Sequence, residues 1–188
     1  GHLLEYHPVV IELRRLIRAG ELGRVLYVYS QRLNLGTVRQ DENALWSLAP
    51  HDISSILFML GQSPTDVSAR GQCCLQRDIE DVVFMNMNFG DQAMAHIHVS
   101  WLDPHKTRRI TVVGSKRMAV FDDADGSEKL RIYDKGADIG DDYNTFAESV
   151  GLRFGDIQIP YFKAVEPLRL ECQHFIDCVR SRQRPISD

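Results

Sequence analysis

One histidine lies where a helix is expected to begin, and this position suits proton transfer. The run 45–52 ends in Pro50, His51 and Asp52, and apolar residues follow at helical spacing: Ile53, Ile56, Leu57 and Leu60. Proline suits the first helical position and Gly61 can close the helix, so His51 is predicted in the first turn. The unsatisfied N–H groups and the positive end of the dipole disfavour imidazolium there. A ring kept neutral near pH 7 can act as a general base, and a histidine that merely caps or packs is the alternative.

Polar residues in the connection before this helix have the chemistry needed to hold a substrate. Asn34, Arg39, Asp41 and Asn43 lie in this predicted loop. The arginine fork suits carboxylate or phosphate oxygens, and asparagine can pair with sugar hydroxyls. Trp101, at the end of a predicted strand, is placed either to stack on a sugar ring or to pack. These residues are therefore substrate-binding candidates, with an ordinary polar loop as the alternative.

Two other histidine groups have residue types that occur in metal or catalytic sites. His96 and His98 share one face of a predicted strand, about 7 Å apart. A metal site also needs a third ligand and a second shell, which the sequence does not place nearby, so structural or interfacial histidines are expected. His174 lies with Cys172 and Cys178 near the apolar stripe of the last predicted helix, where packing is expected. No metal site is predicted.

Composition and charge limit the classes of function. The chain has 188 residues, 44% hydrophobic and 26% charged, a balance typical of one large or two small globular domains. The net charge of -4 argues against nucleic acid or an anionic membrane as the main partner. The four cysteines show neither a zinc-binding nor a disulfide spacing, which favours a reducing cytoplasm.

Familiar nucleotide and hydrolase motifs are missing from the sequence. There is no G-x-G-x-x-G and no G-x-S-x-G, and Gly114-Ser115-Lys116 lacks the upstream glycine of a P-loop. Any nucleotide cofactor is therefore expected to be held mainly by residues outside this chain.

The remaining elements predict an α+β fold with a largely antiparallel, open sheet and helices packed on one face. A strand-like piece at 1–6 precedes a helix that begins at Pro8 and stops at Gly20. Strands are predicted at 25–33, 66–75, 81–89, 93–101, 108–114, 117–122 and 129–134. The stretch 135–163 is predicted to be irregular, and Pro167 opens a last helix.

Alternation along the strands predicts which face of the sheet is buried. In 93–101 the residues Ala95, Ile97 and Val99 face one way, and His96 and His98 face the other. The first face is expected to be core. The second is mixed polar and apolar, as in a sheet that is wetted or used as a subunit interface.

Several segments together resemble the C-terminal domain of the Gfo/Idh/MocA oxidoreductase family, and the resemblance runs over essentially the whole chain. They are 1–8, 20–25, 49–52, 95–101, 111–115 and 166–168. Within the family, 32–36 and 41–46 look like the branch of UDP-N-acetylglucosamine (or uronate) 3-dehydrogenases.

The resemblance implies a function and a domain organisation. Family members pair an N-terminal Rossmann domain with this α+β domain and move hydride between NAD or NADP and a sugar or cyclitol carbon. Residues 1–188 would be the single substrate-binding and oligomerisation domain, without the Rossmann domain, and inactive as a dehydrogenase when alone. His51 matches the family histidine that, with a lysine of a Glu-Lys-Pro motif expected just before the chain, acts on the hydroxyl. The expected partners are a sugar or nucleotide-sugar and further copies of the chain, as a homodimer or homotetramer through the sheet face.

One departure from the family pattern bears on His51. Many members carry an aspartate four residues before the histidine, where this chain has Ser47. A serine can hydrogen-bond but cannot charge the ring. The expected site is therefore His51 with Asn34, Arg39, Asn43, Ser47 and Trp101. The alternative is a non-catalytic binding or oligomerisation module that retains the fold.

Overall fold

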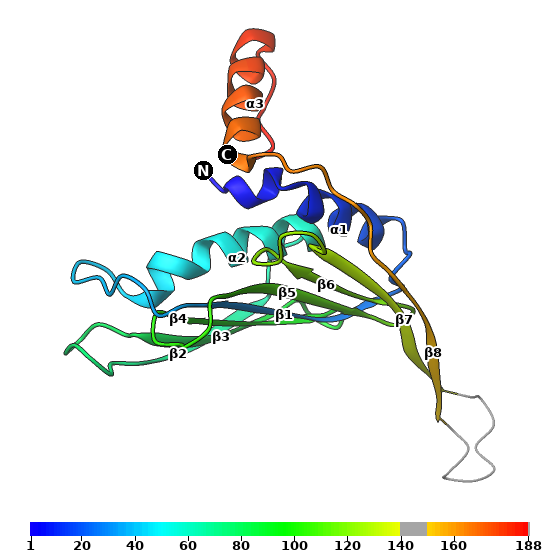
Figure 1. Cartoon of the computed structure of the whole chain (residues 1–188), viewed down its shortest axis with the longest axis horizontal. Coiled ribbons are helices and arrows are strands. Elements are labelled where there is room, and N and C mark those ends of the chain that lie inside the picture. The colour runs from blue at the N-terminus through cyan, green and yellow to red at the C-terminus, as the bar shows by residue number, and fades with distance from the viewer. Residues whose placement is uncertain (140–149, 188) are drawn as a thin grey trace.

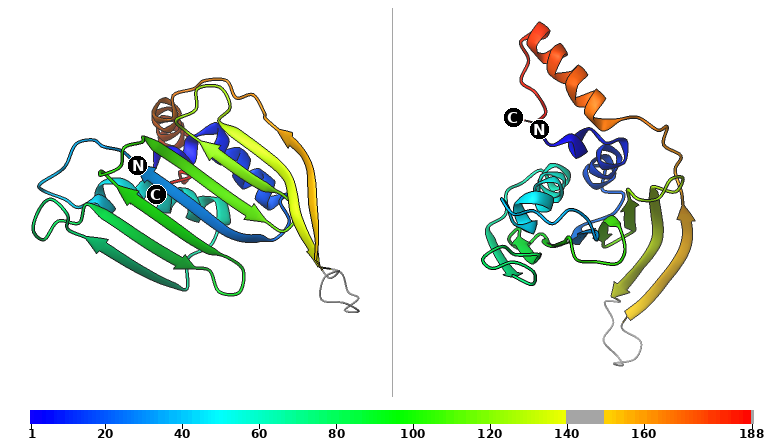
Figure 2. Two further views of the ribbon diagram at one scale, coloured as in Figure 1. Left: turned by 60° about the horizontal axis from the view of Figure 1, so that its bottom comes forward. Right: turned by 60° about the vertical axis from the view of Figure 1, so that its left-hand side comes forward.

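Eight strands in the described part of the chain form one open sheet. The structure is a computed structural model that describes residues 1–139 and 150–187. Its strands, in chain order, are β1 (Val25–Leu33), β2 (Asp66–Gln72), β3 (Val82–Asn88), β4 (Met94–Ser100), β5 (Thr107–Gly114), β6 (Met118–Asp122), β7 (Leu130–Ile139) and β8 (Val150–Gln158). They lie side by side in the order β2-β3-β4-β1-β5-β6-β7-β8 (Figure 2). The predicted α+β class and largely antiparallel open sheet are confirmed.

One neighbouring pair in the described sheet is parallel. β1 pairs with β4 in parallel, with Val28 opposite Ala95, and with β5 in antiparallel, with Val28 opposite Val112. A parallel pair needs a crossover, which here runs through a helix and the β2–β3 hairpin. This crossover carries the helix with His51 across the sheet beside β1.

Helices cover one face of the sheet (Figures 1 and 2). They are η1 (Leu3–Tyr6), α1 (Pro8–Arg18) and α2 (Ala44–Leu60). The core between helices and sheet contains Leu13 and Ile56 from the helices and Ala95, Ile97 and Val99 from β4, all fully buried. The predicted inward face of the strand 93–101 is therefore confirmed.

Two predicted segments were wrong. Residues 3–6 form a 3₁₀ turn with a hydrogen bond from the Glu5 N–H to the His2 carbonyl, and not a strand. The stretch predicted as irregular contains the end of β7 and all of β8, which pair with Lys135 opposite Phe154. Pairing with β7 supplies hydrogen bonds that offset the low strand propensity of the glycines in β8. Residues 140–149 of that prediction lie outside the described residues.

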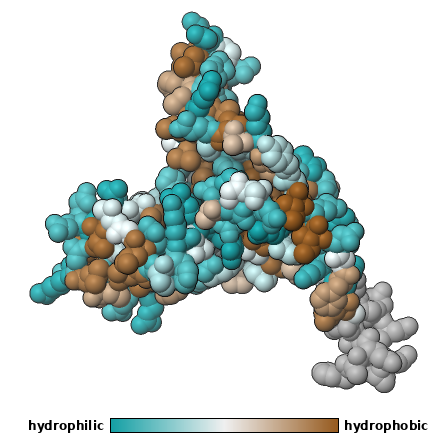
Figure 3. All heavy atoms as spheres, in the orientation of Figure 1, coloured by the Kyte–Doolittle hydropathy of each residue, from teal (hydrophilic) through white to brown (hydrophobic). Residues whose placement is uncertain are grey.

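The last helix, α3 (Pro167–Ser181), projects away from the sheet and its covering helices (Figure 1). Its apolar stripe faces solvent, and apolar residues show along this arm in Figure 3. Phe175 and Val179 are more than half exposed, while Cys178 is buried. The predicted helix and its stripe are present, but the stripe adds little to the core.

Candidate functional site

Helix α2 begins earlier than the sequence pattern predicted. The side chain of Asn43 caps it by accepting a hydrogen bond from the Trp46 N–H at 3.1 Å, and the helix runs from Ala44 to Leu60. Pro50 lies inside the helix, where it costs one backbone hydrogen bond. His51 is therefore in the third turn and not the first, and the helix dipole does not explain its properties. The prediction of Gly61 as the closing residue is confirmed by its left-handed φ of 68°.

Burial keeps His51 neutral. Its pKa is lowered from the usual value, first by burial and then by the positive charge of Arg32, while Asp52 opposes part of this shift. The His51 carbonyl accepts hydrogen bonds from the hydroxyls of Ser54 at 3.1 Å and Ser55 at 2.8 Å, which help to fix the helix beside it. The pKa of His51 is therefore shifted in the expected direction, but the largest cause is burial and not the helix dipole.

His51 borders a cavity of about 330 Å³ between α2, the ends of β1 and β4, and η1. The cavity brings together four of the predicted site residues: Asn34, Ser47, His51 and Trp101. Polar residues that the sequence analysis did not single out also line it: Arg32, Thr37, Ser100, Arg108 and Asp123. The cavity therefore holds His51, hydroxyl and amide groups, two guanidinium groups and one carboxylate.

A buried ion pair adjoins this cavity through Arg32, which lines it. The Asp52 carboxylate, 1% exposed, accepts a hydrogen bond from the Ser30 hydroxyl at 2.6 Å. Its other oxygen accepts from Arg32 Nε at 2.6 Å. Buried charges that are paired and hydrogen-bonded in this way hold their geometry tightly. The pair ties β1 to α2 and fixes the Arg32 guanidinium next to His51.

Trp101 forms a wall of the cavity. It is 3% exposed, and its indole N–H donates to Asp81 at 2.5 Å. Burial alone would raise the pKa of Asp81. Hydrogen bonds from the Leu75 N–H, the Trp101 indole and the Cys74 N–H together outweigh burial, so the net pKa is below its usual value. Because the indole is held from behind by a carboxylate, Trp101 is a rigid packing residue with little surface for stacking.

Arg39 and Asn43 do not line the His51 cavity. Arg39 forms an ion pair with Glu42 at 2.9 Å, and Asn43 donates to Glu80 at 2.8 Å while it caps α2. Arg39 is thus paired within its own segment, whereas Asn43 is held by Glu80 from the segment just before β3. The structure brings neither side chain to the His51 cavity.

The open face of the sheet carries the other strand histidines. His96 Nδ1 lies 2.8 Å from Asn86 Oδ1, and the His98 ring stacks on Phe84 with centroids 4.4 Å apart. Among the described residues no group of three or more histidine, cysteine or acidic side chains gathers as a metal site. His174 accepts a hydrogen bond from the Ile186 N–H at 3.1 Å near the chain end. These rings have aromatic, amide or backbone partners instead of a cavity.

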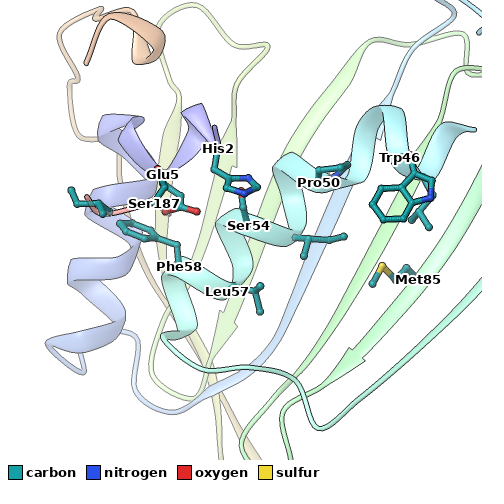
Figure 4. Close-up of a pocket in the computed structure, with 12 residues that line it drawn as sticks. His2, Glu5, Trp46, Pro50, Ser54, Leu57, Phe58, Met85 and Ser187 are labelled. Atoms are coloured by element: carbon teal, nitrogen blue, oxygen red, sulfur yellow. The ribbon is translucent and has the colours of Figure 1, made fainter. Parts of the chain in front are cut away.

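A second groove, of about 540 Å³, lies on another side of α2 (Figure 4). Trp46, Pro50, Leu57 and Phe58 give it an apolar lining, with Glu5 at one end. Burial raises the pKa of Glu5. Apart from Glu5, Ser54, Ser187 and the exposed His2, the lining is apolar, so this groove offers less proton chemistry than the His51 cavity.

Comparison with known families shows which family the chain belongs to. The family model described as the GFO/IDH/MocA C-terminal domain matches residues 10–120, more than half of the chain. The chain belongs to the Gfo/Idh/MocA family. The family assignment made from the sequence is therefore confirmed, and the family consists of NAD(P)-dependent oxidoreductases.

Individual relatives are distant. A 2,7-anhydro-N-acetylneuraminate hydratase from Mediterraneibacter gnavus is 22% identical over 146 residues, covering 70% of this chain and 39% of that protein. The solved UDP-N-acetylglucosamine 3-dehydrogenase from Acidithiobacillus ferrooxidans is 22% identical with a TM-score of 0.72, covering 98% of this chain and 53% of that one. An oxidoreductase from Desulfitobacterium hafniense described as NADPH-dependent is 18% identical with a TM-score of 0.73, covering 99% and 56%. The chain thus spans about half the length of the solved structures, whose similarity shows the fold.

No helix in the described residues combines the length and the apolar character that crossing a membrane requires.

Proposed function

We propose that this chain is the substrate-binding half of an NAD(P)-dependent oxidoreductase that oxidises a sugar hydroxyl, with His51 as the general base. The observation that carries the proposal is the convergence of a neutral His51 with Asn34 and Ser47 in one cavity of an oxidoreductase-family domain. The sugar-acting relatives support the choice of substrate, and the nucleotide-sugar form rests on the named dehydrogenase.

The part of the reaction assigned to this chain is binding and proton removal. Asn34 and Ser47 would hold hydroxyls of the sugar, and neutral His51 would accept the proton of the reacting hydroxyl. A bound nicotinamide supplies the hydride acceptor. The sequence has no dinucleotide fingerprint, so NAD or NADP would be held by an N-terminal Rossmann domain outside residues 1–188. Residues 1–188 alone would then lack dehydrogenase activity.

The test is the activity of the protein encoded by the complete reading frame. It should reduce NAD⁺ or NADP⁺ when given UDP-N-acetylglucosamine, its uronate or a simple sugar. His51→Asn should lower kcat by roughly 10²–10⁴-fold, the usual contribution of a general base. The matched control is His105→Asn, an exposed histidine that does not line the cavity. A protein inert with all these sugars, or an active His51→Asn variant, would contradict the proposal.

A second function is favoured by one observation. Ser47, a residue without charge, faces the same cavity as His51 at the position where many family members carry an aspartate. A chain that binds sugar without oxidising it would be a non-catalytic binding or assembly module. Sugar binding by the full protein without any reduction of NAD⁺ or NADP⁺ would support this alternative.

The open face of the sheet is proposed to join copies of the chain into a dimer or tetramer. It presents Tyr27, Phe84 and Met94, each between 44% and 48% exposed, beside the partly buried His96 and His98. Exposed aromatic and apolar residues on one sheet face are typical of subunit interfaces. Sedimentation at micromolar concentration tests this, and a purely monomeric full-length protein would contradict it.

A further inference from the structure

Two arginines stand directly opposite each other at the wall of the His51 cavity. Arg32 of β1 pairs in register with Arg108 of β5, and both line the cavity. Opposite residues of an antiparallel pair have Cβ atoms about 5 Å apart, and like charges there are destabilising. The pair therefore needs negative charge nearby.

Carboxylates neutralise Arg32 more closely than they neutralise Arg108. Asp52 holds Arg32 through Nε at 2.6 Å. Arg108 has only a 3.7 Å contact with Asp123, and Asp123 is shared with Lys129 at 3.3 Å and His7 at 3.7 Å.

The cluster keeps an excess of positive charge. Three cations, Arg32, Arg108 and Lys129, face the carboxylates of Asp52 and Asp123, which leaves one positive charge uncompensated. His51 and His7 do not add to it near pH 7, because burial lowers the pKa of each ring.

Donors on both arginines remain available to a ligand. Arg32 uses Nε and Nη2 for Asp52, and its Nη1 has no hydrogen-bond partner in the described part of the chain. The Arg108 side chain is 45% exposed. Asn34 and Thr37 line the same cavity and add neutral hydrogen-bonding groups. Guanidinium donors of this kind bind carboxylate and phosphate oxygens strongly.

We infer that the substrate of the His51 cavity is an anionic sugar, whose carboxylate or phosphate is bound by Arg32 and Arg108 while a hydroxyl faces His51. The inference rests on the proposed function and narrows its substrate class. A cavity of about 330 Å³ is at the small end of ligand pockets, which suits one sugar ring with its charged substituent.

The test compares the binding of three sugars to the chain by calorimetry or by NMR. The probes are glucuronate, glucose 1-phosphate and the neutral sugar glucose. At least one anionic sugar should bind at least about tenfold more tightly than glucose, since a charge-assisted hydrogen bond contributes that much. Tighter binding of glucuronate would show that the arginines bind a carboxylate, and tighter binding of glucose 1-phosphate would show that they bind a phosphate.

Arg108→Gln should abolish this preference, and Arg109→Gln is the matched control. Arg109 is the next residue on β5 and points to the other face, where it pairs with Asp122 at 2.7 Å. Arg32 is unsuitable for this comparison because its loss would leave Asp52 buried without its partner.

The outcomes separate this inference from the proposed oxidation. Glucose binding as well as the anionic sugars, failure of both anionic sugars to bind, or a preference that survives Arg108→Gln would each overturn the inference. Oxidation of neutral sugars alone by the full-length protein would also overturn it and leave the proposed function standing. Arg108-dependent binding of anionic sugars without any oxidation would support the inference and count against the proposed function.

Discussion

His51 and the pair His96 and His98 lie on opposite faces of the same sheet and have different surroundings. His51 borders a cavity together with hydroxyl, amide and guanidinium groups. His98 stacks on Phe84, and His96 lies against the Asn86 amide. Burial is the largest cause of a lowered pKa for both His51 and His98. A lowered pKa therefore does not by itself mark a catalytic histidine, and adjoining space and partners for a substrate distinguish His51.

The largest expected effect is on stability, and it distinguishes the buried ion pair of the inner face from the more exposed pair of the open face. Asp52→Asn should lower the free energy of unfolding by about 3 kcal/mol, because it leaves Arg32 largely buried without its counter-charge. Asp122→Asn removes the pair with the half-exposed Arg109 and should cost about 1 kcal/mol or less. Urea unfolding of both variants measures the difference, and equal losses would contradict the contrast between the faces.

Charge placed on the open face should break the proposed assembly. Phe84→Glu, at a position 44% exposed, should weaken self-association by at least about tenfold while the chain stays folded. Trp46→Glu places the same charge at an exposed aromatic residue of the other groove and should leave association unchanged. Sedimentation of both variants is the measurement. Equal effects would show that the open face has no special role.

A carboxylate introduced beside His51 should raise the pKa of the His51 ring. Ser47 precedes His51 by one helical turn and lines the same cavity, so Ser47→Asp should raise the pKa of His51 by about one unit. Ser68→Asp, on the exposed strand β2, should leave it unchanged. NMR titration of the imidazole signals distinguishes the two. An unmoved pKa in Ser47→Asp would mean that the two side chains do not face each other.

The smallest expected effect is the contribution of His51 to the pH dependence of the free energy of unfolding. The folded pKa of His51 lies below its ordinary value of 6.5, so the unfolded chain binds the proton more readily. The contribution of His51 to stability is therefore complete above pH 6.5 and is lost as the pH falls below it. His98 and His7 act in the same direction because burial lowers their pKa too. His51→Gln should reduce the fall in unfolding free energy between pH 7 and 5, and an unchanged slope would contradict this.

The sequence predicted the faces of the sheet well because strand alternation is local. Ala95, Ile97 and Val99 are buried, and His96 and His98 lie on the other face, as expected from the period of two. The start of α2 was predicted too late because a proline inside a helix is unusual, while the capping signal of Asn43 lay seven residues before the expected first residue, Pro50. Local signals thus located the elements better than their ends.

The site was predicted only in part. Asn34, Ser47 and Trp101 do line the His51 cavity, whereas Arg39 pairs with Glu42 three residues along the chain. Arg32 was missed because its place depends on the register of β1 against β5, which is not local in sequence. One signal was available: Ser30 and Arg32 share the inward face of a strand, an unusual place for polar groups, and they meet Asp52 there.

The pKa of the His51 ring in this chain is the most direct test of the account. An NMR titration should place this pKa below 6.5, because burial and the charge of Arg32 lower it. Replacing Asn43, which caps the start of α2, should leave the pKa unchanged. A value at or above 6.5 would mean that the ring is charged in neutral-to-acidic solution. It would contradict the claim that this cavity holds a neutral base ready to accept a proton.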